Sequence, residues 1–145
     1  MKLLIKKLND RATLPKRATP ESAGYDLSAC LAEPLEVKAG QTVKVPTGLS
    51  MAVEGIEKCV LLIYARSSLA TKFGLAPANC VGVVDTDYRG EVLVALHNHS
   101  DQDYTINDGE RVAQLVVTPI YTPDVEERDE LLDTERGTGG FGSTN

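Results

Sequence analysis

Tryptophan is absent from this sequence, and its apolar residues never form a run long enough to cross a membrane as a helix. The start of the chain, Met1–Lys7, becomes charged too early for the apolar core of a secretory signal. We therefore expect a cytoplasmic protein that does not attach to membranes.

Cysteine is scarce as well. The three cysteines, Cys30, Cys59 and Cys80, are far apart in the sequence, lie among apolar residues and form no Cys-x-x-Cys pair. An odd number of scattered thiols argues against a disulfide framework and against a zinc site. We predict that all three are buried free thiols.

Positive charge is too sparse to form a broad basic face. The chain has 15 Lys and Arg against 21 Asp and Glu, and its net charge is −6. The excess is concentrated in residues 124–135, which hold seven acids and one arginine, whereas residues 1–123 are nearly neutral. We expect no stable binding of nucleic acid and no polybasic membrane contact. An anionic ligand would need a metal ion or locally placed donors.

What the sequence does contain is many short apolar segments between Gly, Pro and Asn residues. Its 145 residues and 42% hydrophobic content fit one globular domain. One short helix is predicted within residues 65–74. The pattern favours an all-β sandwich or jelly roll over residues 1–123, with an acidic linker and a flexible Gly-rich C-terminal arm over residues 124–145. Short strands are predicted near residues 3–5, 42–45, 48–53, 58–64, 103–106 and 111–117.

The segment Gly82–Gly90 has the most unusual composition. It lies between two apolar runs, the second at residues 91–96, and we predict that the runs form a β-hairpin. The segment is either a polar turn or a site on a rigid support, and local sequence leaves both readings open. It holds two carboxylates, a phenol and a guanidinium, in Asp85, Asp87, Tyr88 and Arg89.

Glycine is concentrated at the end of the chain, where four of the ten residues from Arg136 to Asn145 are glycines. Such a segment can expose backbone N–H groups to an anion, although it lacks the Gly-Lys-Ser/Thr of a P-loop. A disordered terminus is the alternative. Phe141 and Arg136 favour a functional arm, because a ring can stack on a planar group and a guanidinium can hold a phosphate.

Three further places offer polar groups to a ligand. Arg66, Ser67 and Ser68 begin the predicted helix, where they either bind an anion or only cap the helix. Asp26 alone is more typical of a turn carboxylate than of a site residue. Gln114 interrupts an apolar strand, so its amide either faces solvent or contacts a ligand.

The two histidines form no convincing metal set. His97 and His99 lie on one face of a strand end, but two ligands without a third make a weak site, and we assign them a structural or surface role. No Ser–His–Asp or Cys–His set is visible, which disfavours a covalent nucleophile. Paired carboxylates, anion-binding turns and an aromatic arm together suggest metal-assisted attack of water on a phosphate ester of an aromatic compound.

Five segments in order give the sequence a specific resemblance. They are Ala23–Leu27, Arg66–Ala70, Gly82–Glu91, Gly109–Leu115 and Arg136–Thr144. The sequence resembles the homotrimeric dUTP diphosphatase (dUTPase) family, whose five motifs occur in this order. The resemblance implies a jelly-roll-like β-barrel and a trimer with three active sites at subunit interfaces. It also implies hydrolysis of dUTP to dUMP and pyrophosphate with Mg²⁺ on the triphosphate, which supplies dUMP for dTMP synthesis and keeps uracil out of DNA.

The resemblance further implies roles for individual residues. Asp85 would be the catalytic residue that activates the attacking water, and Tyr88 would pack under the deoxyribose and leave no space for a 2′-hydroxyl. Asp26 would hold water molecules of the Mg²⁺ shell. The other implied substrate-binding residues are Arg66, Ser67, Ser68, Asn79, Gly82, Val83, Val84, Gln114, Arg136, Phe141, Gly142, Ser143 and Thr144.

These residues would divide the substrate between them. Asn79 and the backbone of residues 82–84 would read the uracil edge, and the helix start with Gln114 would contact the phosphates. Arg136 would clamp the terminal phosphate together with the last hydroxyls of the chain. Phe141 would close over the uracil when the arm orders on the substrate.

The sequence departs from the family pattern at three positions. Ser68 stands where Gly is usual, Thr138 where an acid is frequent, and Ala65 where Pro is frequent. None removes a group with an implied catalytic role, but they bear on the phosphate contacts and on the stiffness of the loops. A dCTP deaminase of the same fold is one alternative and would release ammonia. A regulatory trimer that binds another protein, with dUTP as its signal, is another.

Overall fold

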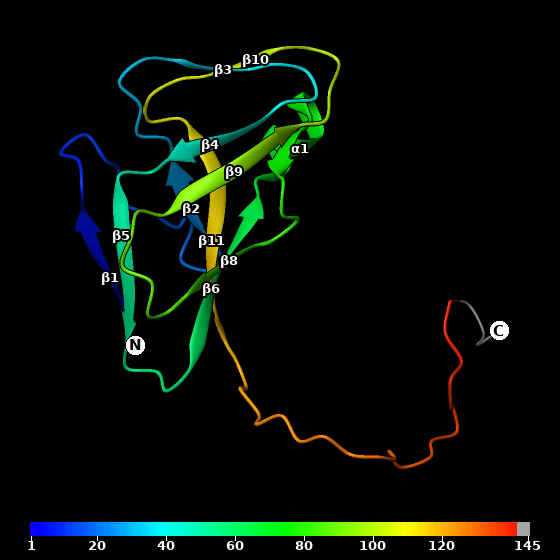
Figure 1. The fold of residues 1–145 in the computed structure, drawn as a ribbon. Helices are drawn as coiled ribbons and strands as arrows, with labels where there is room; N and C mark the ends of the chain where they lie inside the picture. Colours follow the sequence, from blue (N-terminus) through cyan, green and yellow to red (C-terminus); the bar gives the residue numbers. More distant parts are fainter. Residues whose placement is uncertain (142–145) are drawn as a thin grey trace.

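The computed structural model describes residues 1–141, which form strands and one short helix, α1 (Ser67–Phe73). Figure 1 shows their arrangement. The strands are β1 (Lys2–Lys7), β2 (Tyr25–Ser28), β3 (Leu35–Val37), β4 (Thr42–Pro46), β5 (Leu49–Glu54), β6 (Cys59–Ala65), β7 (Leu75–Pro77), β8 (Gly82–Asp85), β9 (Leu93–Asn98), β10 (Tyr104–Ile106) and β11 (Arg111–Pro119).

The largest sheet has the order β2-β11-β6-β8, and every pairing in it is antiparallel. β11 is an inner strand, since it pairs with β2 on one side and with β6 on the other. Its apolar residues Val112, Ala113 and Leu115 are fully buried in the core. β6 lies beside it and pairs Ala65 with Ala113 at one end and Cys59 with Pro119 at the other. The sheet therefore brings β2, β6 and β11, which are distant in sequence, side by side.

The remaining strands complete the fold around one core. β4, β9 and β7 form a three-stranded sheet, while β1 pairs with β5 and β3 pairs with β10. Alternating residues of β9 are buried, as expected for a strand with one face on the core. The core joins residues from all these sheets, including Leu27, Val37, Leu49, Leu61, Leu75, Leu96, Ile106 and Leu115.

Most of the predicted elements are confirmed, and the missed ones are short. The helix and the six strands predicted from residues 3–5 to residues 111–117 all occur, with ends shifted by a few residues. β2, β3 and β7 were not predicted. β3 and β7 have three residues each and β7 ends on a proline, so neither carries a measurable alternation.

The predicted β-hairpin at Gly82–Gly90 is wrong. β8 pairs with β6, where Gly82 lies opposite Ile63, and β9 pairs with β4 and β7 in a different sheet. The apolar runs were correctly identified as strands, but their partners are distant in sequence. The segment between them therefore links two sheets rather than closing a local turn.

One cysteine prediction is also wrong. Cys30 and Cys59 are buried free thiols, as predicted, and burial raises the pKa of both thiols. Cys80, in contrast, is exposed. It lies in the loop before β8 rather than in a paired strand, and its φ is 61°.

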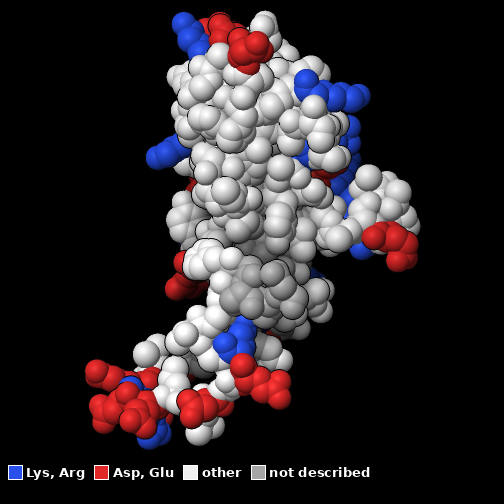
Figure 2. Space-filling view, turned by 90° about the vertical axis from the view of Figure 1, so that its right-hand side faces the viewer, with Lys and Arg blue, Asp and Glu red and all other residues white. Residues whose placement is uncertain are grey.

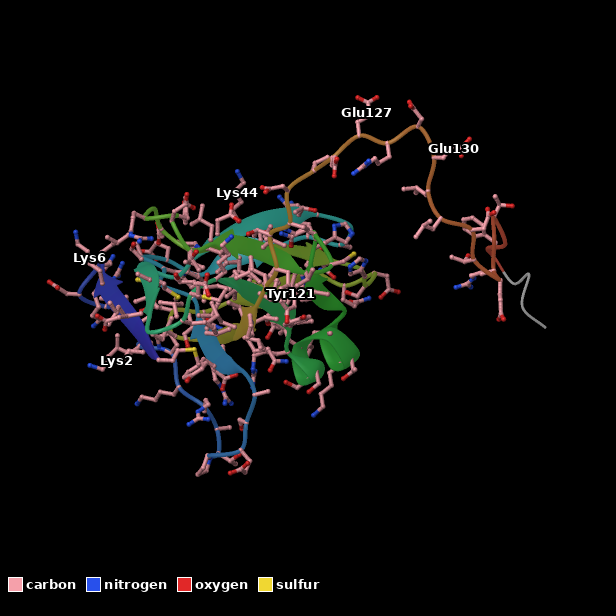
Figure 3. The ribbon with its side chains drawn as sticks, turned by 90° about the horizontal axis from the view of Figure 1, so that it is seen from below. Lys2, Lys6, Lys44, Tyr121, Glu127 and Glu130 are labelled. Carbon is pink, nitrogen blue, oxygen red and sulfur yellow. The ribbon has the colours of Figure 1, made fainter. Side chains whose placement is uncertain are left out.

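The acidic arm extends away from the barrel after β11. From Ile120 to Phe141 no residue belongs to a strand or helix, and the arm runs clear of the sheets in Figure 1. Its acids gather at the lower end of the molecule in Figure 2, and Glu127 and Glu130 lie on the arm in Figure 3, whereas Lys2, Lys6 and Lys44 lie on the barrel. Gly142, Ser143 and Thr144, three of the predicted substrate-binding residues, lie outside the described residues.

Within residues 1–141, α1 is too short to span a bilayer, and no helix there has the length and apolarity that spanning requires.

Candidate active site

Asp26 is the centre of a charged cluster on the four-stranded sheet. Its Oδ1 accepts a hydrogen bond from Arg66 Nε at 2.9 Å, and its Oδ2 accepts one from Arg111 Nη1 at 3.0 Å. The Asp26 and Arg66 side chains are only 20% and 21% exposed, whereas Arg111 is 56% exposed. The inner pair is thus the stronger one, because solvent screens an exposed pair. The three side chains carry a net charge of +1, which suits an anion.

A β-bulge explains why Arg111 reaches this cluster. Residues three apart on a regular strand point to opposite faces, so Arg111 and Gln114 would be separated by the sheet. The register of β11 against β2 shifts between Arg111 and Ala113, and Gln114 then lies opposite Asp26. A bulge commonly redirects a side chain beside a site. Here it brings Arg111 to the carboxylate of Asp26.

Gln114 lies across the same row of the sheet and is held in place. Its Nε2 donates to the backbone carbonyl of Ala65 at 2.9 Å. Its side chain also passes over Gly24, where a Cβ would lie only 2.5 Å from Gln114 Oε1. Gly24 therefore provides the space for the amide. Of the two roles predicted for Gln114, this half-buried, fixed position beside Asp26 favours contact with a ligand.

A pocket of about 330 Å³ opens beside the charged cluster. Arg66 and Ser68 line it from the start of α1, and Arg111 lines it from β11. On its other side the Tyr104 hydroxyl donates to Glu110 Oε1 at 2.5 Å. Burial, and then this contact with Glu110, raise the pKa of Tyr104 to about 12. The pocket thus combines two guanidinium groups with one carboxylate that is already hydrogen-bonded.

The two serines at the start of α1 do not cap the helix. The N-cap residue is Arg66, and it makes no side-chain capping hydrogen bond. Ser67 and Ser68 are exposed, and their hydroxyls have no hydrogen bond within residues 1–141. The N-cap alternative therefore does not explain these residues. Of the two, Ser68 lines the same pocket as Arg66 and Arg111.

A second pocket, of about 240 Å³, lies where β8 ends. Val83, Val84 and Asp85 line it from β8, and Tyr88 lines it from the following segment. The Tyr88 backbone N–H donates to the Asp85 carbonyl at 3.1 Å, and the Tyr88 hydroxyl donates to the Glu91 carbonyl at 3.0 Å. Both ends of Tyr88 are therefore held, and its ring presents a fixed apolar wall next to a carboxylate.

Asn79 and Gly82 lie next to each other at the start of β8. The Asn79 amide nitrogen is 3.5 Å from the place that a Cβ on Gly82 would occupy, and Asn79 is exposed. The backbone of this loop is tight, since the Val81 N–H donates to the Asn79 carbonyl at 2.6 Å. A polar amide and the edge of β8 that pairs with no other strand among residues 1–141 are thus available to a planar ligand.

A single chain does not bring the two pockets together. Asp85 pairs with Val60 on β6, while Arg66 follows the opposite end of that strand. Six residues of strand separate these positions, a distance of about 20 Å. Arg136 and Phe141 lie on the arm, and Phe141 is fully exposed. The predicted residues therefore form a pocket around Asp85, a cluster around Asp26 and an arm.

A cavity larger than these two pockets lies elsewhere on the described chain. It has a volume of about 540 Å³ and lies between the residues that precede β6 and the start of the arm, Ile56–Lys58 and Pro119–Pro123. The side chains of Lys58 and Thr122 bridge it by a hydrogen bond. None of the predicted site residues lines it, so its size does not mark the site.

A family model described as dUTPase matches residues 10–145. The chain belongs to the dUTPase family. Named deoxyuridine 5′-triphosphate nucleotidohydrolases are close relatives. That of Desulfitobacterium hafniense is 47% identical over 133 residues, covering 90% of this chain and 86% of the relative. That of Nautilia profundicola is 46% identical and covers 99% of both chains.

Solved dUTPase structures have the same fold. The dUTPase of Staphylococcus bacteriophage 80alpha, in a variant with bound dUpNHpp, superposes with a TM-score of 0.87 at 27% identity, over 98% of this chain and 97% of that one. The dUTPase of phage phi11 of S. aureus, described with a structural Mg(II) ion, gives a TM-score of 0.81 at 23% identity, over 92% and 100%, which shows the fold alone. The strands of this dUTPase thus form the jelly-roll-like barrel that the sequence predicts.

Two residues at this candidate site were not predicted from the sequence. Arg111 lies within the motif Gly109–Leu115 and Glu91 ends the motif Gly82–Glu91, but neither residue type indicated the contacts that the structure shows. The signal for Arg111 was present as a charged residue at the start of an apolar strand. Its partner was not foreseeable, because the bulge that redirects it leaves no mark in the residue types.

Proposed function

We propose that this dUTPase hydrolyses dUTP with Asp85 as the residue that activates water. The observation that carries the proposal is the pocket at the end of β8, where an exposed carboxylate and the ring of Tyr88 line one cavity. The water oxygen attacks the α-phosphorus while its proton passes to the Asp85 carboxylate. The bond from the α-phosphorus to the bridging oxygen breaks, and pyrophosphate leaves with that oxygen.

Tyr88 selects the sugar in this proposal. Its ring is fixed through its hydroxyl and backbone, so it packs against deoxyribose without moving aside. An added 2′-hydroxyl would meet the ring. A rigid wall matters because a soft apolar pocket rejects an added hydroxyl only about 100-fold.

The base is read at the start of β8. Asn79 and the backbone of residues 82–84 offer an amide and an unpaired strand edge to the polar edge of uracil. Backbone groups held at fixed spacing recognise the uracil pattern of donors and acceptors. They leave no room for the amino group of cytosine or the methyl group of thymine.

The phosphates bind at the Asp26 cluster. Arg66 supplies a guanidinium already oriented by Asp26, and Ser68 lines the pocket beside it. The Ser67 hydroxyl and the Gln114 amide would contact the same phosphate chain. Charged hydrogen bonds to phosphate are strong when the donor is held in place. We propose that Arg136 and Phe141, with Gly142, Ser143 and Thr144, close over the bound nucleotide, so that residues 124–145 serve as linker and lid.

The residues around Asp26 fit Mg²⁺ carried by the nucleotide. No group of three or more His, Cys, Asp or Glu side chains within residues 1–141 surrounds a cation position. Each oxygen of Asp26 accepts one hydrogen bond from an arginine, which leaves lone pairs for water. Mg²⁺ keeps several waters and takes its other ligands from phosphates, and when bound it neutralises charge on the triphosphate. Asp26 would hold those waters.

The distance between the two pockets supports a homotrimer with sites at subunit interfaces. Asp85 and Arg66 are about 20 Å apart along β6, too far to act on one α-phosphate within a chain. A neighbouring subunit would bring its phosphate cluster to the β8 pocket. Exposed apolar side chains on the barrel fit such contacts, among them Leu4, Tyr64, Val83 and Leu93. The two buried free thiols fit our expectation of a cytoplasmic enzyme.

Pyrophosphate release tests the proposal. The full-length protein, supplied in turn with dUTP, dCTP, dTTP and UTP, should release pyrophosphate rapidly from dUTP alone, and chelation of Mg²⁺ should reduce the rate. Ammonia release from dCTP would instead identify a deaminase. Equal turnover of dUTP and UTP would overturn the role of Tyr88.

A further inference from the structure

The segment that carries Tyr88 belongs to no strand, yet it is fastened to a second segment far away in sequence. Residues 86–92 lie against residues 47–50, which comprise the turn between β4 and β5 and the first two residues of β5. Side chains take part in three of the four contacts, so this attachment depends on residue identity. The hydrogen bonds are Thr47 Oγ1 to Val92 O (2.7 Å), Gly48 N to Glu91 Oε1 (2.7 Å), Val92 N to Leu49 O (2.8 Å) and Ser50 Oγ to Arg89 O (2.8 Å).

The turn at Gly48 is a rigid base for this attachment. Its carbonyl accepts a hydrogen bond from the Leu8 N–H at 2.8 Å, and the Cys30 N–H donates to the Pro46 carbonyl at 2.8 Å. Thr47 is fully buried. The turn is therefore tied to two other parts of the chain, and a group bonded to it shares its position.

Glu91 connects this base to Tyr88. Its carboxylate accepts the Gly48 N–H, and its backbone carbonyl accepts the Tyr88 hydroxyl at 3.0 Å. It also lines the pocket that contains Asp85 and Tyr88. One residue thus joins the rigid turn on one side to the end of the Tyr88 ring on the other.

We infer that Glu91 is a positioning residue that sets the place of the Tyr88 ring and thereby the discrimination between deoxyribose and ribose. The inference rests on the proposed role of Tyr88 as the wall under the sugar. Without the carboxylate, residues 88–91 lose their bond to Gly48, and the ring can move aside for a 2′-hydroxyl. Asp85 keeps its place, because β8 holds it opposite Val60 on β6. The loss should therefore fall on sugar selection more than on the chemical step.

Steady-state kinetics of the full-length protein with dUTP and UTP tests this role. Glu91→Ala should raise KM for dUTP and lower the dUTP-to-UTP ratio of kcat/KM by about three- to tenfold, with a smaller change in kcat, since one hydrogen bond is lost. Glu91→Gln should retain the ratio, because its amide oxygen accepts the same bond from Gly48. Glu36→Ala is the matched control, since Glu36 is an exposed acid on β3 with no hydrogen bond from its side chain in the described chain.

Two further measurements distinguish a failure of the inference from a misfolded variant or a failure of the proposed function. Hydrogen exchange of the Gly48 amide should accelerate in Glu91→Ala and stay slow in Glu91→Gln, whatever the activity. Tyr88→Phe breaks the other end of the link and should lower the ratio similarly, with no additive loss in the double variant. This variant keeps the test open if Glu91→Ala does not fold. The inference is overturned if the wild type hydrolyses dUTP and the dUTP-to-UTP ratio of kcat/KM is the same in Glu91→Ala and Tyr88→Phe as in the wild type. A wild type that does not turn over dUTP would instead overturn the proposed function.

Discussion

Asp85 is the last residue of β8, where its backbone pairs with Val60 and its carboxylate is exposed. Because the strand pairing fixes its backbone, the residue should stay in place when its charge is removed. Asp85→Asn should therefore preserve the fold and the binding of dUTP while removing the base. We expect kcat to fall by about 10²–10⁴-fold with little change in KM, as for the loss of a general base. Pyrophosphate release under saturating dUTP measures kcat, and binding of a non-hydrolysable analogue measures affinity. A variant with near-normal kcat would rule out this role.

At this scale the sequence predicted residue types better than partners. Asp26 alone was typical of a turn carboxylate, and the resemblance gave it waters of a Mg²⁺ shell; in the structure Arg66 and Arg111 each bind one of its oxygens. Arg66 was predicted to bind substrate, a role that stays a prediction, and its ion pair with Asp26 was not foreseen. The Arg111 contact depends on the bulge in β11, which the residue types do not indicate.

The turn between β4 and β5 illustrates what an element requires of one residue. Gly48 has φ at 68°, and a Cβ there would lie 2.8 Å from Ala12 Cβ and 2.9 Å from Cys30 Sγ. Gly48→Ala should lower the free energy of unfolding by about 2–4 kcal/mol, from left-handed strain and overpacking together. Thermal or urea unfolding measures the change.

Gly40 provides the control for that substitution. It has a similar φ of 72°, but a Cβ there would meet nothing within 4 Å. Gly40→Ala should therefore lower the free energy of unfolding only by the cost of the left-handed backbone, about 1–2 kcal/mol. Equal losses in the two variants would mean that the close contacts around Gly48 contribute nothing to the loss of stability.

Long strands were predicted well, whereas the partner of each strand in its sheet was not predicted. β6 and β11 have continuous apolar runs, so their existence followed from the residues. The pairing of β8 with β6, and of β9 with β4 and β7, did not. Alternation identifies a strand, but it contains no information on which distant strand lies beside it.

At the scale of the whole molecule, the arm should contribute little to the stability of the barrel. Deleting residues 136–145 removes no contact to the barrel among the described residues, so thermal stability should stay unchanged. We expect kcat/KM for dUTP to fall by about 100-fold or more, since an arm that closes over the substrate orients it and excludes water. Steady-state pyrophosphate release with the truncated and full-length proteins tests this.

A milder variant distinguishes the ring from the rest of the arm. Phe141→Leu should give an intermediate loss, because the backbone and Arg136 remain while stacking on the base is removed. A truncated protein with unaltered kcat/KM would mean that residues 136–145 are only a terminus.

The exposed position of Cys80 makes the chain convenient to label. Cys30 and Cys59 are buried, and burial raises the pKa of their thiols, so little reactive thiolate forms at either one. A thiol-directed fluorophore should attach at Cys80 without any engineered substitution. Its place next to Asn79 puts the dye beside the loop proposed to read uracil. The protein thus has its own attachment point for an optical sensor of nucleotide binding.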